Sequence, residues 1–232
     1  LASRKIVDGI NWAQTLVGNE DVAKAVEKGK SAFVGPEIAG KTLGIIGLGA
    51  IGAQLANAAT HLGMKVYGYD PYITVDAAWS LSKSVNRAKT LAAIYENCDY
   101  ISIHVPSTPE TKGMINETSI SCMKDGVRLL NLARADLVNA DAVKKALETG
   151  KVASYVTDFP TAEVLGVPGI VTIPHLGAST PESEDNCAVM AATELIDYLE
   201  SGNIKNSVNF PEAVIPHTGD ARLCVFHKNV PA

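Results

Sequence analysis

The sequence lacks several features that would place it in particular classes of protein. Its 232 residues include only four cysteines, Cys98, Cys122, Cys187 and Cys224, at spacings typical of neither a disulfide framework nor a metal site. Its longest apolar runs have the length of a strand, so we expect no membrane-spanning segment. It has no basic cluster and a net charge of −5, which argues against a nucleic-acid surface. These absences predict a cytoplasmic globular protein with reduced thiols, no metal and no membrane or nucleic-acid partner.

The chain begins with Leu1 and carries no signal peptide. We therefore expect Leu1 to lie inside a longer protein. Apolar residues make up 47% of the chain and charged residues 19%. This composition and length suit one large domain, or one and a half ordinary ones, with a sizeable core.

The most informative stretch is residues 41–70, which read KTLGIIGLGAIGAQLANAATHLGMKVYGYD. The apolar run 42–46 predicts a buried strand, and residues 47–52 then fit the pattern G-x-G-x-x-G. Apolar residues at helical spacing follow, and Gly63 is expected to end that helix because glycine readily adopts the left-handed cap conformation. Residues 65–69 predict a second strand. The stretch therefore indicates a βαβ unit whose glycines lie at the first turn.

Each residue of this turn has a physical reason to be there if a dinucleotide binds. Gly47 permits the tight turn, Gly49 lets a pyrophosphate approach the backbone, and Gly52 lets the helix pack close to the strand. The helix N-terminus offers unpaired N–H groups to phosphates. Asp70 lies 18 residues after Gly52, where its carboxylate can bind a ribose 2′-hydroxyl and repel a 2′-phosphate. The carboxylate at this position favours NAD over NADP. The alternative to a dinucleotide site is a glycine-rich turn in an ordinary α/β protein.

Buried strands and helices alternate along the rest of the chain. Strands are expected at 100–105, 127–132, 152–156 and 169–173, with helices near 1–16, 91–95, 141–149 and 181–200. Asp141 is expected to cap the third of these helices. This alternation predicts an α/β fold, a Rossmann-type doubly wound parallel sheet with helices on both faces.

Polar side chains follow the ends of the expected strands. They are Asp70, Thr108, Arg134, Asp158 and His175. Because parallel strands end at one edge of the sheet, where open α/β sheets bind ligands, these residues should gather there. His104 lies within the expected strand 100–105, so it is either a catalytic residue or a satisfied core histidine, and the second is the default.

Three of these groups suit chemistry beside a nicotinamide. His175 can act as acid and base near neutral pH. Glu163 could pair with it and stabilise the imidazolium. Arg134 offers a fork for a carboxylate. Hydride transfer to a 2-oxo acid needs a proton donor, a group that tunes it and a carboxylate clamp, while the cofactor carries the hydride.

Six motifs in order resemble those of the D-isomer-specific 2-hydroxyacid dehydrogenases. They are GLGAIG, YDPY, HVPSTPETKGMIN, NLARADLVN, the pair Asp158 and Glu163, and PHLGAST. The resemblance covers about residues 1–211 and implies Arg134, Glu163 and His175 as catalytic residues. It implies that Asp158 holds the nicotinamide carboxamide. The further cofactor contacts expected are Gly47, Gly49, Ala50, Ile51, Gly52, Asp70, His104, Val105, Pro106, Thr111, Leu132, Ala133, Arg134, His175 and Gly177.

The loop that carries Glu163 departs from the family pattern. It reads TDFPTAEV, without the valine and the final proline of the family's D-V-F-x-x-E-P. Only 11 residues lie between Glu163 and His175, which indicates a shortened loop. The family's substrate lobe is also absent from this sequence.

The last part of the chain narrows the resemblance. PHLGASTPESEDNCA, SGNIKNSVNFPE and the tail RLCVFHKNVPA resemble members that oxidise D-3-phosphoglycerate, the first step of serine biosynthesis. Residues 1–200 are then expected to form the NAD-binding domain, with flanking helices at 1–16 and 181–200. Residues 201–216 would be a linker. Residues 217–232 would begin an ACT-like regulatory domain, with a first strand at 222–226.

Other functions remain open. The protein could be a glyoxylate or hydroxypyruvate reductase, a D-lactate dehydrogenase, an NAD-sensing corepressor-like binding protein, or an NAD-binding fragment without chemistry of its own. The resemblance implies a homodimer or higher homo-oligomer, with the region around Trp12 reaching the partner. From the residues alone, Trp12 and Phe33 either contact a partner or pack on the sheet edge.

Overall fold

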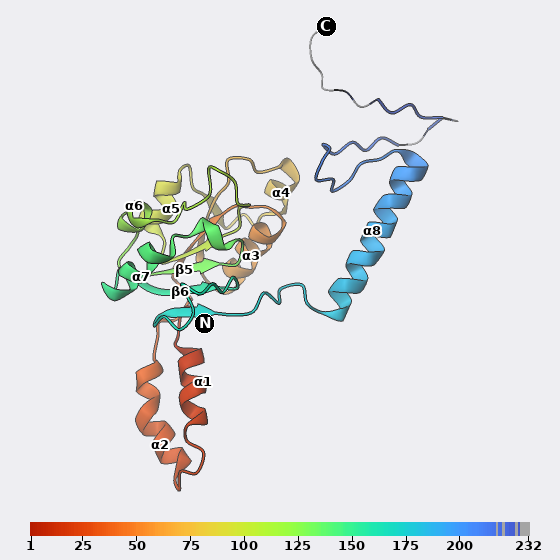
Figure 1. Ribbon diagram of the computed structural model, residues 1–232. Coiled ribbons are helices and arrows are strands. Elements are labelled where there is room, and N and C mark those ends of the chain that lie inside the picture. The colour runs from red at the N-terminus through yellow and green to blue at the C-terminus, as the bar shows by residue number, and fades with distance from the viewer. Residues whose placement is uncertain (217, 220, 226, 228–232) are drawn as a thin grey trace. The chain divides into compact units, whose positions relative to one another are not determined.

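The computed structural model describes residues 1–216, 218, 219, 221–225 and 227. The chain divides into two compact units, residues 1–175 and residues 176–232 (Figure 1). The first unit holds the sheet and the second holds the long C-terminal helix. Each unit is described by itself below.

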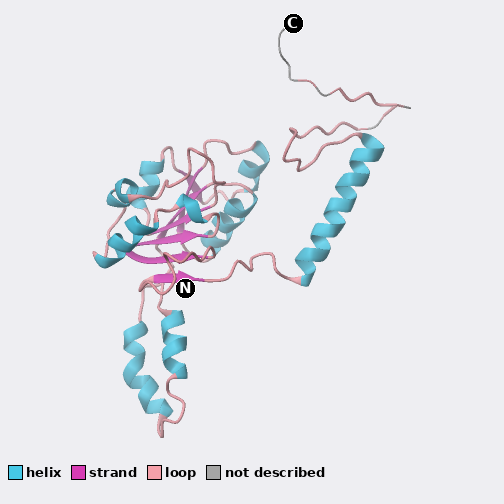
Figure 2. Cartoon of the chain, in the orientation of Figure 1, coloured by secondary structure: helices cyan, strands magenta, loops and turns pink. Residues whose placement is uncertain are grey.

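The first unit is built on a seven-stranded sheet in which every neighbouring pair of strands is parallel (Figure 2). The strand order is β3-β2-β1-β4-β5-β6-β7. The strands are β1 (Thr42–Ile46), β2 (Lys65–Tyr69), β3 (Val85–Arg87), β4 (Tyr100–Ile103), β5 (Val127–Asn131), β6 (Val152–Thr157) and β7 (Ile170–Thr172). The predicted parallel sheet is confirmed.

Two apolar clusters cover the two faces of this sheet. Leu43 and Ile45 of β1 pack with Ala56 of helix α3 (Ala50–His61) on one face. Ile46 points the other way, because side chains alternate along a strand, and joins the cluster formed by α5 (Leu91–Asn97), α6 (Glu117–Ser121) and α7 (Ala140–Glu148). Figure 1 shows helices on both sides of the sheet. The doubly wound arrangement is therefore confirmed.

The first unit contains further short helices. These are α1 (Ile6–Gln14), α2 (Val22–Gly29), α4 (Val75–Ser80) and the 3₁₀ turns η1 (Lys30–Phe33) and η2 (Ala135–Leu137). Gly63 follows α3 with a φ of +78°, as expected for a glycine that ends a helix. In the described part of the chain, no helix is long and apolar enough to cross a membrane.

Helices α1 and α2 form a hairpin that projects from the sheet (Figure 1). Neither helix has a buried residue. The ring of Trp12 packs against Phe33, with 5.2 Å between ring centroids, and also lies against Gly29. The two aromatic residues thus pack on each other rather than on the sheet edge.

Two local predictions in the first unit were wrong. Strand β4 ends at Ile103, so His104 follows the strand instead of lying within it, although its N–H still donates to the Ile46 carbonyl (2.7 Å). The cap of α7 is Asn139, whose side-chain oxygen accepts from the Ala142 N–H (2.9 Å). Asp141 lies in the first turn of that helix, because the helix begins one residue before it.

In the second unit, α8 (Pro181–Ser201) is capped at its N-terminus by Thr180, whose hydroxyl accepts from the Ser183 N–H. Gly202 caps its C-terminus. Residues 203–216 are irregular apart from an antiparallel bridge between Ile204 and Ala213. The strand expected at 222–226 is not formed: residues 221–225 have no regular structure, and residue 226 lies outside the described residues. A strand needs a neighbour for its backbone hydrogen bonds, and the described residues provide none there.

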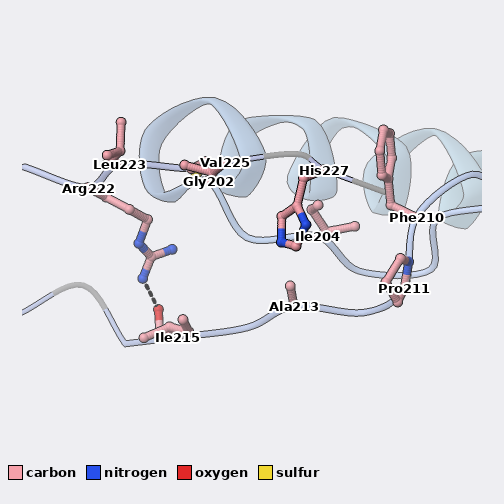
Figure 3. A pocket seen from close by; sticks show the side chains of 11 residues that line it. Gly202, Ile204, Phe210, Pro211, Ala213, Ile215, Arg222, Leu223, Val225 and His227 are labelled. Carbon is pink, nitrogen blue, oxygen red and sulfur yellow. Dashed lines mark hydrogen bonds between the residues drawn. The ribbon is translucent and has the colours of Figure 1, made fainter. Parts of the chain in front are cut away.

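The ACT-like domain expected at 217–232 falls largely on residues outside the described ones (217, 220, 226 and 228–232). The second unit does contain a pocket of about 430 Å³ (Figure 3). Arg222 crosses it and donates to the Ile215 carbonyl and to the side-chain oxygen of Asn203. Since these acceptors belong to the unit itself, Arg222 ties the irregular segment to the end of α8.

Gly44 in β1 is a sensitive point of the core. A Cβ there would lie 2.6 Å from Cγ2 of Ile94 and 2.8 Å from the sulfur of Cys98. We expect Gly44→Ala to lower the unfolding free energy by about 1–3 kcal/mol, because α5 must move away from the sheet. Urea unfolding measures this. Gly49→Ala is the control, since its Cβ would meet no atom within 4 Å; equal stability of the two variants would contradict the packing described.

Candidate functional site

The candidate site lies where the strand order reverses, between β1 and β4. In open α/β sheets, ligands bind at this point, outside the carboxyl ends of the strands. The N–H of Gly47 donates to the Tyr69 carbonyl (2.9 Å), which joins the turn after β1 to the end of β2. The turn after β1 is thus held between its two neighbouring strands.

The three glycines of the turn divide into two packed positions and one open one. A Cβ on Gly52 would lie 2.0 Å from the Gly47 carbonyl oxygen, and a Cβ on Gly47 would lie 2.6 Å from the His104 carbonyl oxygen. Gly49 stands at the N-terminus of α3, where a Cβ would meet nothing within 4 Å. Gly47 and Gly52 let backbones meet, while Gly49 leaves the helix N-terminus open to a phosphate group.

Asp70 is held beside this turn by two backbone donors. Its Oδ2 accepts from the Leu48 N–H and its Oδ1 from the Tyr72 N–H, both at 2.8 Å. Each carboxylate oxygen can accept a further bond, so the group remains able to bind ribose hydroxyls. The geometry agrees with the role expected for Asp70.

Apolar side chains are exposed at the same edge. Ile51, at the start of α3, is 70% exposed, and Leu132, directly after β5, is 42% exposed. Aliphatic side chains exposed beside a polar cradle suit the flat faces of a nucleotide. Ala50 and Ala133 are their chain neighbours, so the expected contact residues occupy two turns of this edge.

The loop after β4 is fixed by its own side chains. The hydroxyl of Thr111 donates to the Pro106 carbonyl (2.6 Å) and accepts from the Thr108 N–H (2.8 Å). Ser107 donates to the Asp136 carboxylate (2.6 Å), which links this loop to the one after β5. Val105, Pro106 and Thr111 therefore belong to an ordered part of the edge.

His104 lies beneath the glycine turn. Its Cβ would be 3.5 Å from a Cβ on Gly52, and its Nε2 lies 2.8 Å from the hydroxyl of the buried Ser102. Burial lowers the pKa of His104 below its ordinary value. The half-buried side chain therefore packs against the turn and has Ser102 as a hydrogen-bond partner.

Arg134 is placed by a residue that the sequence did not single out. Asn131, fully buried at the end of β5, donates to the Arg134 carbonyl (2.8 Å) and to the Tyr155 hydroxyl (3.2 Å). Its side-chain oxygen accepts from the Ala133 N–H (3.3 Å). These bonds fix the turn 131–134, from which the exposed guanidinium extends. An asparagine among apolar strand residues is the one sequence signal that could have revealed the role of Asn131.

Asp158 is buried directly after β6, with 7% of its surface exposed. Its Oδ1 has no hydrogen-bond partner in the described part of the chain. A buried carboxylate oxygen without a donor is costly, so this position calls for one. The amide of a nicotinamide would supply such a donor, and the site fits the cofactor at this point as well as at the glycine turn.

His175 and Glu163 are both exposed. The imidazole of His175 packs against Phe159, with 4.8 Å between ring centroids. Glu163 lines a cavity of about 230 Å³ together with Asp136 and Phe159. Among the described residues, no hydrogen bond or ion pair joins Glu163 to His175. Gly177 belongs to the second unit and is exposed.

Comparison with known proteins places this geometry in a family. Residues 5–177 match the model of the D-isomer specific 2-hydroxyacid dehydrogenase, NAD binding domain. The chain belongs to the D-isomer-specific 2-hydroxyacid dehydrogenase family. NAD is accordingly the cofactor of this domain, and the earlier resemblance is confirmed.

Among its relatives are two proteins named D-3-phosphoglycerate dehydrogenase. The one from Bacillus subtilis is 37% identical over 194 residues, covering 81% of this chain and 36% of the relative. The one from Haemophilus influenzae is 36% identical over 214 residues, covering 87% of this chain and 51% of the relative. The chain thus spans about a third to a half of the length of the curated relatives it matches.

Solved structures of the family share the fold. The holo form of Rhodotorula graminis D-mandelate dehydrogenase superposes with a TM-score of 0.70 at 26% identity, covering 84% of this chain and 57% of that one. Aquifex aeolicus D-lactate dehydrogenase, complexed with NAD and lactic acid, gives a TM-score of 0.65 at 28% identity, covering 78% and 60%. The Rossmann-type fold is therefore confirmed.

Gly49→Ala separates cofactor binding from folding. The new methyl group meets no protein atom within 4 Å, and Gly49 has a φ of −69°, which alanine adopts without strain. We expect unchanged thermal stability but NADH affinity lowered by about tenfold or more, because the methyl group occupies the approach of the pyrophosphate. NADH fluorescence titration measures the affinity, and unaltered binding would show that the phosphates lie elsewhere.

His104 should make folding sensitive to mild acid. Since its folded pKa is lowered, its contribution to stability is complete above the ordinary value of 6.5 and is lost as the pH falls below that value. We expect the melting temperature to fall less between pH 7.5 and pH 5.5 in His104→Gln than in the wild type. His61→Gln, at an exposed position on α3, is the control and should behave as the wild type does.

Proposed function

We propose that the chain is the NAD-binding part of an enzyme that oxidises D-3-phosphoglycerate to 3-phosphohydroxypyruvate. The observation that carries the chemistry is the grouping of Arg134 and His175 about Phe159, beside the unpartnered oxygen of Asp158. The names of the two relatives above support the phosphorylated substrate. Another 2-hydroxy acid is the alternative that the same geometry allows.

The side chains divide the work of the reaction. His175 takes the proton of the C2 hydroxyl, since imidazole accepts and releases protons near neutral pH. Arg134 holds the substrate carboxylate through its planar fork and thereby orients C2. Bound NAD would supply the acceptor for the hydride of C2. In the reverse direction, His175 returns the proton to the carbonyl oxygen.

Two further carboxylates have proposed roles. Asp158, whose Oδ1 has no partner among the described residues, would accept a hydrogen bond from the carboxamide of the nicotinamide and help to hold it. Glu163 stabilises the imidazolium of His175. For this, the loop that carries Glu163 would have to approach His175. Its place on the exposed segment after β6, in the same loop as Phe159, supports this role.

The helical hairpin supports a homodimer or higher homo-oligomer. Helices α1 and α2 have no buried residue, and Ile6 and Ile10 are 40% and 55% exposed. Apolar helix faces of this kind are typical of an interface between subunits. The four cysteines are free thiols, which supports a cytoplasmic location.

A panel of 2-oxo acids tests the substrate. The protein in its full natural length is assayed for NADH consumption with 3-phosphohydroxypyruvate, hydroxypyruvate, glyoxylate and pyruvate. We expect the phosphorylated acid to give a kcat/KM at least about tenfold above the others. Preference for a small unphosphorylated acid would overturn the proposed substrate, and NADH binding without any turnover would favour an NAD-sensing protein.

His175→Ala tests the proton transfer. We expect kcat to fall by a factor of at least about 10²–10⁴, as is typical for loss of a general acid–base group. NADH binding should remain within about twofold of the wild type, because hydrogen bonds elsewhere hold the glycine turn. His61→Ala is the matched control and should keep full activity. Turnover retained in His175→Ala would remove this role.

A further inference from the structure

Two side chains from two strand ends lie against one aromatic ring, which follows the strand between them. The guanidinium carbon of Arg134 lies 5.9 Å from the ring centroid of Phe159. The imidazole of His175 lies 4.8 Å from the same centroid, at an interplanar angle of 54°. Arg134 follows β5, Phe159 follows β6 and His175 follows β7. Phe159 is thus the contact that the two proposed catalytic side chains share.

The ring is itself held in place. The Phe159 N–H donates to the hydroxyl of Thr157, which is 1% exposed (3.1 Å). Thr157 pairs with Asn131 of β5 on one side and with Thr172 of β7 on the other. The backbone that carries Phe159 is therefore anchored to the sheet between the two strands that position its neighbours.

Arg134 and His175 have few other restraints. Both side chains are exposed. In the described part of the chain, Arg134 forms no salt bridge, and its one side-chain hydrogen bond is to the adjacent Ala133 carbonyl (2.7 Å). A guanidinium is attracted to the face of an aromatic ring, and tilted aromatic contacts are favourable as well. Phe159 accordingly limits the rotamers that both side chains would otherwise sample.

We propose that Phe159 is a positioning residue that holds the carboxylate clamp Arg134 and the acid–base group His175 at a fixed separation. This inference rests on the proposed function. Among the described residues no hydrogen bond or ion pair joins Glu163 to His175, so the ring of Phe159 supplies an orienting contact for the imidazole. Phe159 takes no part in the bonds that change; it pre-organises the two groups that do.

Substitutions at Phe159 test this role in the full-length enzyme. Phe159→Leu keeps an apolar side chain of similar bulk but removes the ring, whereas Phe159→Tyr and Phe159→Trp keep it. We expect Phe159→Leu to lower kcat/KM for the 2-oxo acid by about tenfold, which is about 1.4 kcal/mol. KM should rise, since the carboxylate clamp is loosened, and kcat should fall, since His175 is less well oriented. NADH affinity should stay within about twofold.

The aromatic variants separate positioning from packing. Phe159→Tyr and Phe159→Trp should restore kcat/KM to within about threefold of the wild type. Leu165→Ala, on the same loop and 56% exposed, is the control and should leave both constants unchanged. The ring protons of His175 should also show an upfield ring-current shift in the NMR spectrum that is lost in Phe159→Leu.

Each outcome distinguishes this inference from the proposed function. Wild-type protein that turns over no 2-oxo acid overturns both. If the wild type is active and Phe159→Leu has the same kcat/KM, only the positioning role is overturned. Equal loss in Phe159→Leu and Phe159→Tyr, together with a lowered melting temperature, would show that Phe159 only fills space.

Discussion

The contact between the glycine turn and its neighbouring strand controls the rest of this site. Gly52 approaches the Gly47 carbonyl so closely that no Cβ fits, and Gly47 in turn lies against the backbone of His104. This close approach brings the N-terminus of α3 to the switch point of the sheet, with Asp70 hydrogen-bonded beside it. Gly47 and Gly52 are packed against backbone, whereas the position of a Cβ on Gly49 is open, so a phosphate group could approach the turn there.

The same sheet edge also organises the chemistry. Parallel strands deliver Arg134, Asp158 and His175 to one side, and each is placed by a different kind of restraint. A buried amide fixes the turn that bears Arg134, burial leaves Asp158 with an unpartnered oxygen, and an aromatic ring holds the imidazole of His175. The ends of parallel strands can therefore present together the side chains that the proposed function needs.

Much of this could be predicted from the sequence, because the signals are local. The bounds of β1 and β2 follow directly from the apolar runs beside the glycine motif, and the parallel pairing of the strands follows from their alternation with helices. Helices α2, α4 and α6 escaped prediction because each is short, at eight residues or fewer. The strand expected at 222–226 is not formed for a different reason. Its apolar pattern is local, but its backbone hydrogen bonds need a neighbouring strand, which the described residues do not provide there.

Each missed site residue has at least one partner that is distant in sequence. Asn131 meets Tyr155 across the β5–β6 pair, and Phe159 contacts both Arg134 and His175. Nothing in the spacing of these residues reveals the contacts, whereas the glycine motif shows its function within a few positions. Expected roles that depend on a local motif therefore found geometric support, and the role of Glu163, which depends on a loop meeting His175, still rests on the proposal above.

The central claim is that this sheet edge binds NAD through the glycine turn and Asp70. The most direct test compares the binding of NADH and NADPH to the protein by fluorescence titration under the same conditions. The account predicts binding of NADH and an affinity for NADPH at least about tenfold weaker, because the Asp70 carboxylate repels a 2′-phosphate. Equal affinity for the two, or binding of neither, would contradict it.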